Sequence, residues 1–286
     1  MEKNVTSLEF DERAFLKNNE NYKIHLVDNF ETMYSKIHDH DFIEIFILIS
    51  GSVTYVIEQG NYELKDFDII LVPPHTIHQL TVTNKDVKYK RLVLWIRKQY
   101  LERLSSAKTY LLEQFMSHTK RNHYVIRNPE FTFKIKPYLE KIIELDKEKE
   151  YGYDLLIENT FRELFIYANI ALENEYDIVT SKGNPIVQRI IKHIEENLSN
   201  ELSLKELSNA LNFDEFYISH LFKKEVGTTI HKYVVRKRLS EAKKLLEQNY
   251  SVKDLISLIG FKDESHFIQC FKDEYGFTPK QYKLSL

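Results

Sequence analysis

Short apolar runs dominate the chain from Tyr22 to Ile96. They are rich in β-branched and aromatic residues, and turn-forming pairs such as Gly60-Asn61 and Pro73-Pro74 separate them. Runs of this kind bounded by turn signals are typical of strands. The pattern predicts a sandwich or small barrel of many short strands, with apolar runs at residues 43–49, 53–57, 69–72 and 92–96.

The periodicity becomes helical after about Gln99. Apolar residues recurring on one face predict helices over residues 100–116, 133–145 and 154–172. The stretch from Tyr176 to Asn184 has no periodicity and holds Thr, Ser, Lys and Gly, so it is the predicted interdomain linker. At 286 residues the chain is long enough for two domains, each with its own core.

The last hundred or so residues contain one pattern twice. Leu211-Asn212-Phe213 and Phe222 in the first copy correspond to Ile259-Gly260-Phe261 and Phe271 in the second. The offset is 48 residues at the first part (212 to 260) and 49 at the second (222 to 271), so one extra residue lies between Phe261 and Phe271. A repeat of this length in helical code indicates two copies of one supersecondary unit.

Each copy predicts a short helix, a tight turn and a second short helix, which is the helix-turn-helix arrangement. Ser203 and Ser251 are the expected N-caps of the first helices, and Asp214 and Asp263 those of the second helices. Gly260 supplies a turn, because a residue without Cβ can take positive φ. One long helix is predicted between the copies, from residue 229 to 248.

These residues resemble the DNA-binding domain of the AraC/XylS family of transcription regulators, over roughly Pro185 to Tyr282. The matching segments are 213–224, 236–242, 260–267 and, most closely, 271–282 (FKDEYGFTPKQY). The resemblance implies an α+β two-domain chain with an N-terminal cupin-like β-barrel, trailing helices and a C-terminal all-α domain. It implies binding to double-stranded promoter DNA, a small-molecule effector, with carbohydrate suggested first, a homodimer, and RNA polymerase as a partner if the protein is an activator.

The predicted division is an effector-binding and dimerisation domain over residues 1–175, a linker over 176–184 and a DNA-binding domain over 185–286. Within the last, the first helix-turn-helix spans about 203–226, the linker helix about 229–248 and the second helix-turn-helix about 251–275. Dimerisation is expected through the helices over 133–145 and 154–172, because the second is apolar over much of its circumference.

Base contacts are expected on the face of each recognition helix that lies opposite its apolar residues, at positions that match the family's base-contacting ones. These residues are Phe216, Ser219 and His220 in the first helix and Glu264, Ser265, Ile268 and Gln269 in the second. His220 stands where the family often has arginine. Ile268 can touch a thymine methyl and Gln269 can pair with adenine. Phosphate contacts are expected from Lys223, Lys224 and Lys272, which position the domain without specifying sequence.

Charge and cysteine content narrow the class of protein. The net charge of −3 argues against general coating of nucleic acid. From Asn184 onward, 16 basic and 14 acidic residues give +2, which leaves −5 for the remainder. The DNA-binding half must therefore gather its basic residues on one face.

The single cysteine, Cys270, excludes an intramolecular disulfide and fits a reducing cytosol. No signal peptide opens the chain and no apolar run approaches the ~20 residues of a membrane span, so a cytoplasmic location is expected.

A histidine-rich pattern lies among the predicted strands. His38, His40 and Glu44 precede Gly51, and His78 follows downstream in the segment from Pro73. On a regular strand the first three would point to one face. The pattern resembles the two cupin motifs, although His75 stands where glycine is usual, and in cupins these residues bind a divalent metal. Three nitrogens and one carboxylate suit zinc, iron, nickel or manganese.

Three interpretations of this pattern stay open. The four residues His38, His40, Glu44 and His78 hold a metal, line an effector pocket without metal, or are satisfied by structural hydrogen bonds. The leading hypothesis is a ligand-responsive transcription regulator that needs no cofactor and has no catalytic residues. The alternatives are a metal-dependent cupin enzyme with an accessory DNA-binding domain, and a regulator whose barrel serves only dimerisation.

Overall fold

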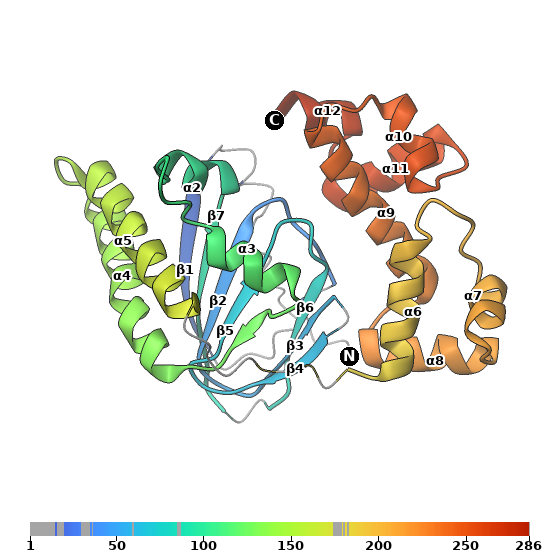
Figure 1. Cartoon of the computed structure of the whole chain (residues 1–286), viewed down its shortest axis with the longest axis horizontal. Coiled ribbons are helices and arrows are strands. Elements are labelled where there is room, and N and C mark those ends of the chain that lie inside the picture. Colours follow the sequence, from blue (N-terminus) through green and yellow to red (C-terminus); the bar gives the residue numbers. More distant parts are fainter. Residues whose placement is uncertain are drawn as a thin grey trace, which may run out of the picture.

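A computed structural model describes residues 15, 20–29, 35, 37–58, 60–84, 87–173, 179, 181 and 183–285 of the chain. Most of residues 1–21 and most of the expected linker, residues 176–184, lie outside these described residues. The strands and the first helices form one body, and the later helices form a second body beside it (Figure 1).

Two antiparallel sheets face each other in the first body. The larger sheet has the strand order β1-β7-β2-β5-β8, and the smaller has the order β4-β3-β6. All four predicted apolar runs lie within these strands. The strands are β1 (Tyr22–Asn29), β2 (Ile43–Ser50), β3 (Val53–Ile57), β4 (Gly60–Leu64), β5 (Ile69–Val72), β6 (His78–Val82), β7 (Tyr89–Ile96) and β8 (Val125–Ile126).

Strands β2, β5 and β7 of the larger sheet are buried on both faces, which explains why they have continuous apolar runs. Ile45 and Leu94 belong to a core that the sheet shares with the helices, whereas Phe46 and Val93 belong to a second core between the two sheets. Helices α4 (Pro129–Glu148) and α5 (Tyr153–Glu173) cover the outer face of the larger sheet (Figure 1).

The predicted single helix over residues 100–116 is wrong. The chain forms α2 (Lys98–Leu104) and α3 (Glu113–Lys120), with an irregular segment between them. The Ser105 hydroxyl donates to the Leu101 carbonyl (2.8 Å) and accepts from the Leu111 N–H (3.0 Å). The Ser106 hydroxyl accepts from the Thr109 N–H (3.1 Å). Serine hydroxyls that bond local backbone in this way compete with a continuous helix.

The second body consists of helices. They are α6 (Pro185–Glu196), α7 (Leu204–Leu211), α8 (Glu215–Val226), α9 (Ile230–Glu247), α10 (Val252–Ile259), α11 (Glu264–Tyr275) and α12 (Pro279–Ser285). Helix α9 contributes Tyr233 and Val234 to the core of the first helix-turn-helix unit, and Leu239 and Leu246 to the core of the second. One rigid element therefore connects the two units.

The predicted helix caps are confirmed. Ser203, Asp214, Ser251 and Asp263 each accept a hydrogen bond from the backbone N–H three residues on, at 2.7–3.2 Å. The turns use left-handed residues, Asn212 (φ 58°) in the first unit and Gly260 (φ 74°) in the second. Because Phe213 runs directly into cap Asp214 while Lys262 separates Phe261 from cap Asp263, Lys262 is the extra residue of the second copy.

Candidate functional site

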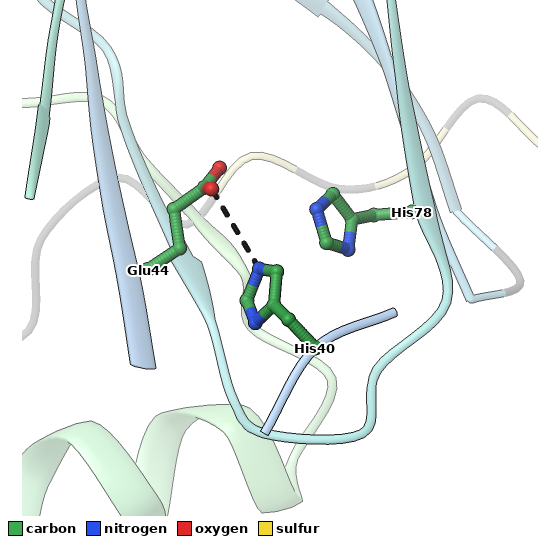
Figure 2. A group of neighbouring side chains, drawn as sticks. All are labelled: His40, Glu44 and His78. Carbon is green, nitrogen blue, oxygen red and sulfur yellow. Dashed lines mark ion pairs between the residues drawn. The ribbon is translucent and has the colours of Figure 1, made fainter. Parts of the chain in front are cut away.

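Three of the four predicted polar residues converge between the two sheets. One donor atom from each of His40, Glu44 and His78 lies within 4.8 Å of the others, and all three residues are buried. Figure 2 shows the two imidazole rings and the carboxylate turned toward one another, with 3.6 Å between His40 Nε2 and a Glu44 oxygen. We call these three residues the donor cluster.

His38 lies next to the donor cluster and does not complete it. Its ring centroid is 4.1 Å from that of His78, and its backbone pairs with His78 through two hydrogen bonds, of 3.0 and 2.9 Å. His38 and His40 precede β2, so the expected regular strand through His38, His40 and Glu44 is wrong. The side chains converge because the His38–His78 pairing brings the segment before β2 against the start of β6.

Hydrogen bonds to the backbone fix the orientation of both cluster histidines. His40 Nδ1 is 2.9 Å from the Phe42 carbonyl oxygen, and His78 Nδ1 is 2.8 Å from the Thr76 carbonyl oxygen. A carbonyl accepts only, so each Nδ1 carries a proton, and in the neutral ring each Nε2 presents a lone pair. Among the described residues, neither Nε2 has a hydrogen-bond partner. Burial lowers the pKa of His78, which favours the neutral ring.

Glu44 is held as a carboxylate by two donors. The Tyr55 hydroxyl donates to one of its oxygens at 3.0 Å and the Trp95 indole N–H donates to the other at 2.8 Å. The cluster thus combines one charged oxygen donor with two nitrogen lone pairs.

This donor set fits a divalent first-row metal ion. Such ions bind neutral imidazole and carboxylate, and a ligating histidine usually donates its other ring N–H to a carbonyl or carboxylate. Both cluster histidines have that arrangement. Unpartnered polar atoms that are buried cost free energy, so the two Nε2 atoms call for a ligand that accepts their lone pairs.

Aromatic side chains occupy the space beside the donor cluster. Phe15 is fully buried and meets Phe42 and Trp95 edge-on, with centroid distances of 5.0 and 5.9 Å. The Phe42 ring stacks on His40 at 3.9 Å. A hollow of about 660 Å³ lies elsewhere, over β3 and β4, where Tyr62, Lys65 and Arg127 contribute to its wall; none of the four predicted pocket residues lines it.

The predicted base-contacting residues lie on the solvent side of α8 and α11. Phe216 is 81% exposed, more than any other large apolar residue of α8, and its ring stacks near His220 with 6.2 Å between centroids. Ser219 and Ile268 are half-buried beside their helix cores, and Gln269 donates to Asp273 on its own helix at 2.7 Å. The other predicted contacts are exposed: His220, Glu264, Ser265, Gln269, Lys223, Lys224 and Lys272.

A third set of polar residues lies between the two bodies and was not predicted from the sequence. Asp39 and Asp41 alternate with the histidines of the first cupin-like motif, and His75 precedes His78 in the second. These three residues contact helices α9, α11 and α12. The signal was present as the charged neighbours within His38-Asp39-His40-Asp41. Charged residues of this kind are usually solvated, so only the structure identifies their partners.

Comparison with known proteins is consistent with this architecture. Residues 28–165 match the family described as AraC-like ligand binding domain, and residues 207–285 match the family described as helix-turn-helix domain. The transcriptional activator AarP of Providencia stuartii is 33% identical over 107 residues, which are 37% of this chain and 79% of AarP. The transcriptional activator RhaS of Mannheimia succiniciproducens is 23% identical over 86% of this chain and 88% of its own.

A solved structure matches the C-terminal part. The C-terminal domain of the response regulator YesN from Fusobacterium nucleatum is 35% identical and covers 34% of this chain and 95% of that domain, with a TM-score of 0.33. Against three further curated relatives, the chain spans only 22 to 38% of their length. The chain belongs to the AraC family of helix-turn-helix transcription regulators. None of the described helices is both long and apolar enough to cross a membrane.

Proposed function

We propose that this chain is a sequence-specific transcription regulator whose donor cluster, with His38 beside it, is the effector site. The observation that carries the proposal is the pair of buried Nε2 lone pairs on His40 and His78, which face Glu44 and have no hydrogen-bond partner among the described residues. The cost of burying such groups is recovered only when a ligand binds them.

A divalent metal ion is the ligand that the donors suit best. His40 and His78 would supply nitrogen and Glu44 oxygen, and the ion would neutralise the buried carboxylate while accepting both lone pairs. Carbohydrate, which the family resemblance suggests, needs a cavity and free ring faces. Here the Phe15, Phe42 and Trp95 rings pack on one another, so a sugar at this place would have to displace Phe15.

The division of labour follows the two bodies. We propose effector binding and dimerisation within residues 1–175, a linker over 176–184 and DNA binding within 185–286. The residues proposed to read bases are Phe216, Ser219, His220, Glu264, Ser265, Ile268 and Gln269, and those proposed to bind phosphate are Lys223, Lys224 and Lys272. RNA polymerase is a partner if the regulator activates, and the cytoplasm is its place of action.

The alternative is a metal-dependent cupin enzyme with an accessory DNA-binding half. The same donor cluster would serve both roles. Two observations favour regulation: two complete helix-turn-helix units follow the barrel, and closely packed aromatic rings adjoin the donors. We therefore assign no catalytic residue.

The test compares ligand binding in the wild-type chain with binding in a Glu44→Gln, His78→Ala variant. Protein purified without chelator is analysed for metal, then stripped and titrated with Zn²⁺, Ni²⁺ and Mn²⁺ by calorimetry and thermal shift. We expect one ion per chain and at least about a hundredfold weaker binding in the variant, since first-row ions depend on each ligand. A panel of sugars is screened in parallel, and binding of a sugar without metal would refute the metal assignment.

A further inference from the structure

One polar stripe of helix α9 faces the barrel. Lys237, Ser240, Lys243 and Glu247 recur every three or four residues, which places them on one face of a helix. Each contacts the N-terminal body. Lys237 bridges Glu58 to Glu195 of α6, the Ser240 hydroxyl donates to the His75 carbonyl at 3.0 Å, and Glu247 lies 3.1 Å from His75 Nε2.

Lys243 is the centre of this interface and is only 2% exposed. Its ammonium nitrogen is 4.0 Å from a carboxylate oxygen of Asp39, itself 4% exposed, and 4.5 Å from the centroid of the Tyr275 ring. The Tyr275 hydroxyl donates to Asp39 at 3.1 Å. The Tyr282 hydroxyl lies 2.7 Å from Glu247 and 3.2 Å from Asp41. A buried ion pair of this kind tolerates little change in its geometry, because each charge has lost its water.

The two barrel segments in this interface are the segments that carry the two histidines of the donor cluster. In residues 38–41, His38 and His40 turn inward while Asp39 and Asp41 turn toward the helices. In residues 73–78, His78 turns inward while His75 contacts α9 and Ile77 packs in the core of the first helix-turn-helix unit. The two segments also bond to each other, since the His75 N–H donates to the His40 carbonyl at 2.6 Å.

The interface holds the C-terminal ends of both recognition helices. Tyr275, the last residue of α11, bonds Asp39, and Glu274 beside it pairs with Arg236 of α9 at 2.6 Å. Gly227, which caps α8, is so close to Gln79 of β6 that an added Cβ would lie 2.9 Å from the Gln79 side-chain oxygen. Both recognition helices are thereby fixed to the barrel. Figure 1 shows the second body, to which they belong, beside the strands of the first.

We propose that residues 38–41 and 73–78 form a lock on helix α9, and that occupancy of the donor cluster loosens this lock and raises DNA affinity. The proposal rests on the proposed function, in that the cluster is taken as the effector site. A ligand that binds both Nε2 atoms draws His40 and His78 toward itself. Their neighbours Asp39 and His75 share the same backbone and must shift with them, which disturbs the buried contacts to Lys243, Ser240 and Glu247. Packed interfaces of this type switch between discrete arrangements.

Breaking the lock by mutation should mimic the ligand. The full chain carrying Asp39→Asn and Lys243→Met is compared with the wild type and with Lys244→Met, a matched control at an exposed neighbouring lysine. The probe is a DNA fragment selected from a random pool by the wild-type chain. Without added metal, we expect the double variant to bind this DNA on the order of tenfold more tightly, within the usual range of allosteric coupling, and the control to bind as the wild type does.

Hydrogen exchange tests the lock without DNA. We expect faster exchange in residues 236–247 and 38–41 of the double variant and, in the wild type, on addition of Ni²⁺. A milder variant, Tyr282→Phe, removes one hydroxyl from the interface and keeps the ring, with Tyr250→Phe as its exposed control. It should show the same changes at smaller amplitude, so a misfolded double variant does not leave the question open.

The outcomes separate the lock from the function it rests on. If no form of the chain selects DNA, the proposed function fails. If the chain binds DNA but the lock variants bind it no more tightly than their controls, the lock is refuted and the regulator stands. If the lock variants bind more tightly but Ni²⁺ changes neither exchange nor affinity, or His78→Ala leaves the Ni²⁺ response intact, control by the donor cluster is overturned.

Discussion

His25 shows how burial of a single ring makes the barrel sensitive to acid. Burial lowers the pKa of His25 from 6.5 to about 4, and its ring lies 5.3 Å from the ring of Trp95, the only tryptophan. The unfolded chain takes up this proton near pH 6.5, whereas the folded chain resists it until about pH 4. Stability contributed by neutral His25 is therefore present above pH 6.5 and is lost progressively as the pH falls toward 4.

We expect the free energy of unfolding of His25→Gln to fall less steeply than that of the wild type as the pH is lowered. Urea unfolding followed by Trp95 fluorescence between pH 7.5 and 4.5 measures the barrel directly. The matched control is His231→Gln, an exposed histidine on α9, which should leave the profile unchanged. If the free energy of unfolding falls as steeply with acid in His25→Gln as in the wild type, other groups cause the acid sensitivity. The buried and neutral His78 would then be the next group to test.

His220 is the residue whose loss should alter base recognition. It is exposed on α8, with Phe216 stacked beside it, and nothing in its own unit needs its side chain. His220→Ala should cost about 1–3 kcal/mol against the preferred base and relax specificity at one or two base pairs. Lys224→Ala should instead weaken binding to all sequences and lower the salt dependence. Selection and footprinting with both variants compares the two effects, and an unchanged sequence preference in His220→Ala contradicts the assignment.

Single residues explain which parts of the site were predictable. Ser203, Asp214, Ser251 and Asp263 cap helices as expected, because capping depends on a few neighbouring atoms. Convergence of the donor cluster was also predictable, although its geometry was not. His40 lies outside any strand, and its position depends on pairing between residues 38 and 78, which local sequence does not encode.

At the scale of elements, the two turns of the helix-turn-helix units illustrate one conformation reached by different residues. Asn212 and Gly260 both adopt left-handed φ, at 58° and 74°. At Gly260 a Cβ would also lie 2.6 Å from the Leu198 carbonyl oxygen, so this position excludes side chains for two separate reasons. The position of Gly152 has a similar φ of 78° with nothing within 4 Å of an added Cβ.

These two glycines separate backbone strain from steric clash. Gly152→Ala should destabilise its domain by about 1 kcal/mol through φ alone, whereas Gly260→Ala should cost about 3 kcal/mol or more because the clash adds to the strain. Gly260→Asn should fall between Gly260→Ala and the wild type if φ dominates, since asparagine tolerates this conformation. Denaturant unfolding of each variant gives the free energies, and equal losses at residues 152 and 260 would disprove the contribution of the Leu198 contact.

Elements that depend on distant partners were the ones that periodicity could not predict. The apolar positions in residues 100–116 suggested one helix, yet Ser105 and Ser106 break it while Leu111 and Leu112 remain buried. Apolar spacing there reflects burial against α5 and the sheet rather than a continuous helix. Similarly, the long helix over 229–248 was predicted correctly. Its polar stripe that faces the barrel, however, has the same sequence pattern as a solvated helix face, so its burial could not be predicted.

At the scale of the whole molecule, many polar contacts join the two bodies, and one apolar core also spans them, because Ile77 packs in the core of the first helix-turn-helix unit. Lys243 and Asp39 are buried where the bodies meet, and Glu58 is half-buried there beside Lys237. Burial raises the pKa of Glu58, against the opposing charge of Lys237. An interface built from buried charges contributes little net stability but strongly disfavours partial separation. An interface with this property fits a molecule whose two bodies switch between two arrangements better than one whose bodies stay permanently in contact.

A second whole-molecule surface lies on the far side of the barrel. The apolar residues of α5 divide as the proposed dimer requires: Ile157, Phe161 and Leu164 are buried against the sheet, whereas Leu155 (63%) and Ile170 (50%) are exposed. Ile166 lies between these two and is also exposed, so the three form a stripe along one side of the helix. Phe133 of α4 adds an exposed ring. A stripe of this kind is a candidate for a two-fold interface.

We predict that charged residues on this stripe separate the proposed dimer. Ile166→Glu with Ile170→Glu should raise the dimer dissociation constant at least about tenfold, which corresponds to about 1.4 kcal/mol. Sedimentation of the full chain across micromolar concentrations measures this constant, with Leu258→Glu on α10 as an exposed apolar control outside the stripe. A wild-type chain that is monomeric at these concentrations would refute dimerisation. A dimer that tolerates both glutamates would move the interface away from α5, and the exposed stripe would then need another partner.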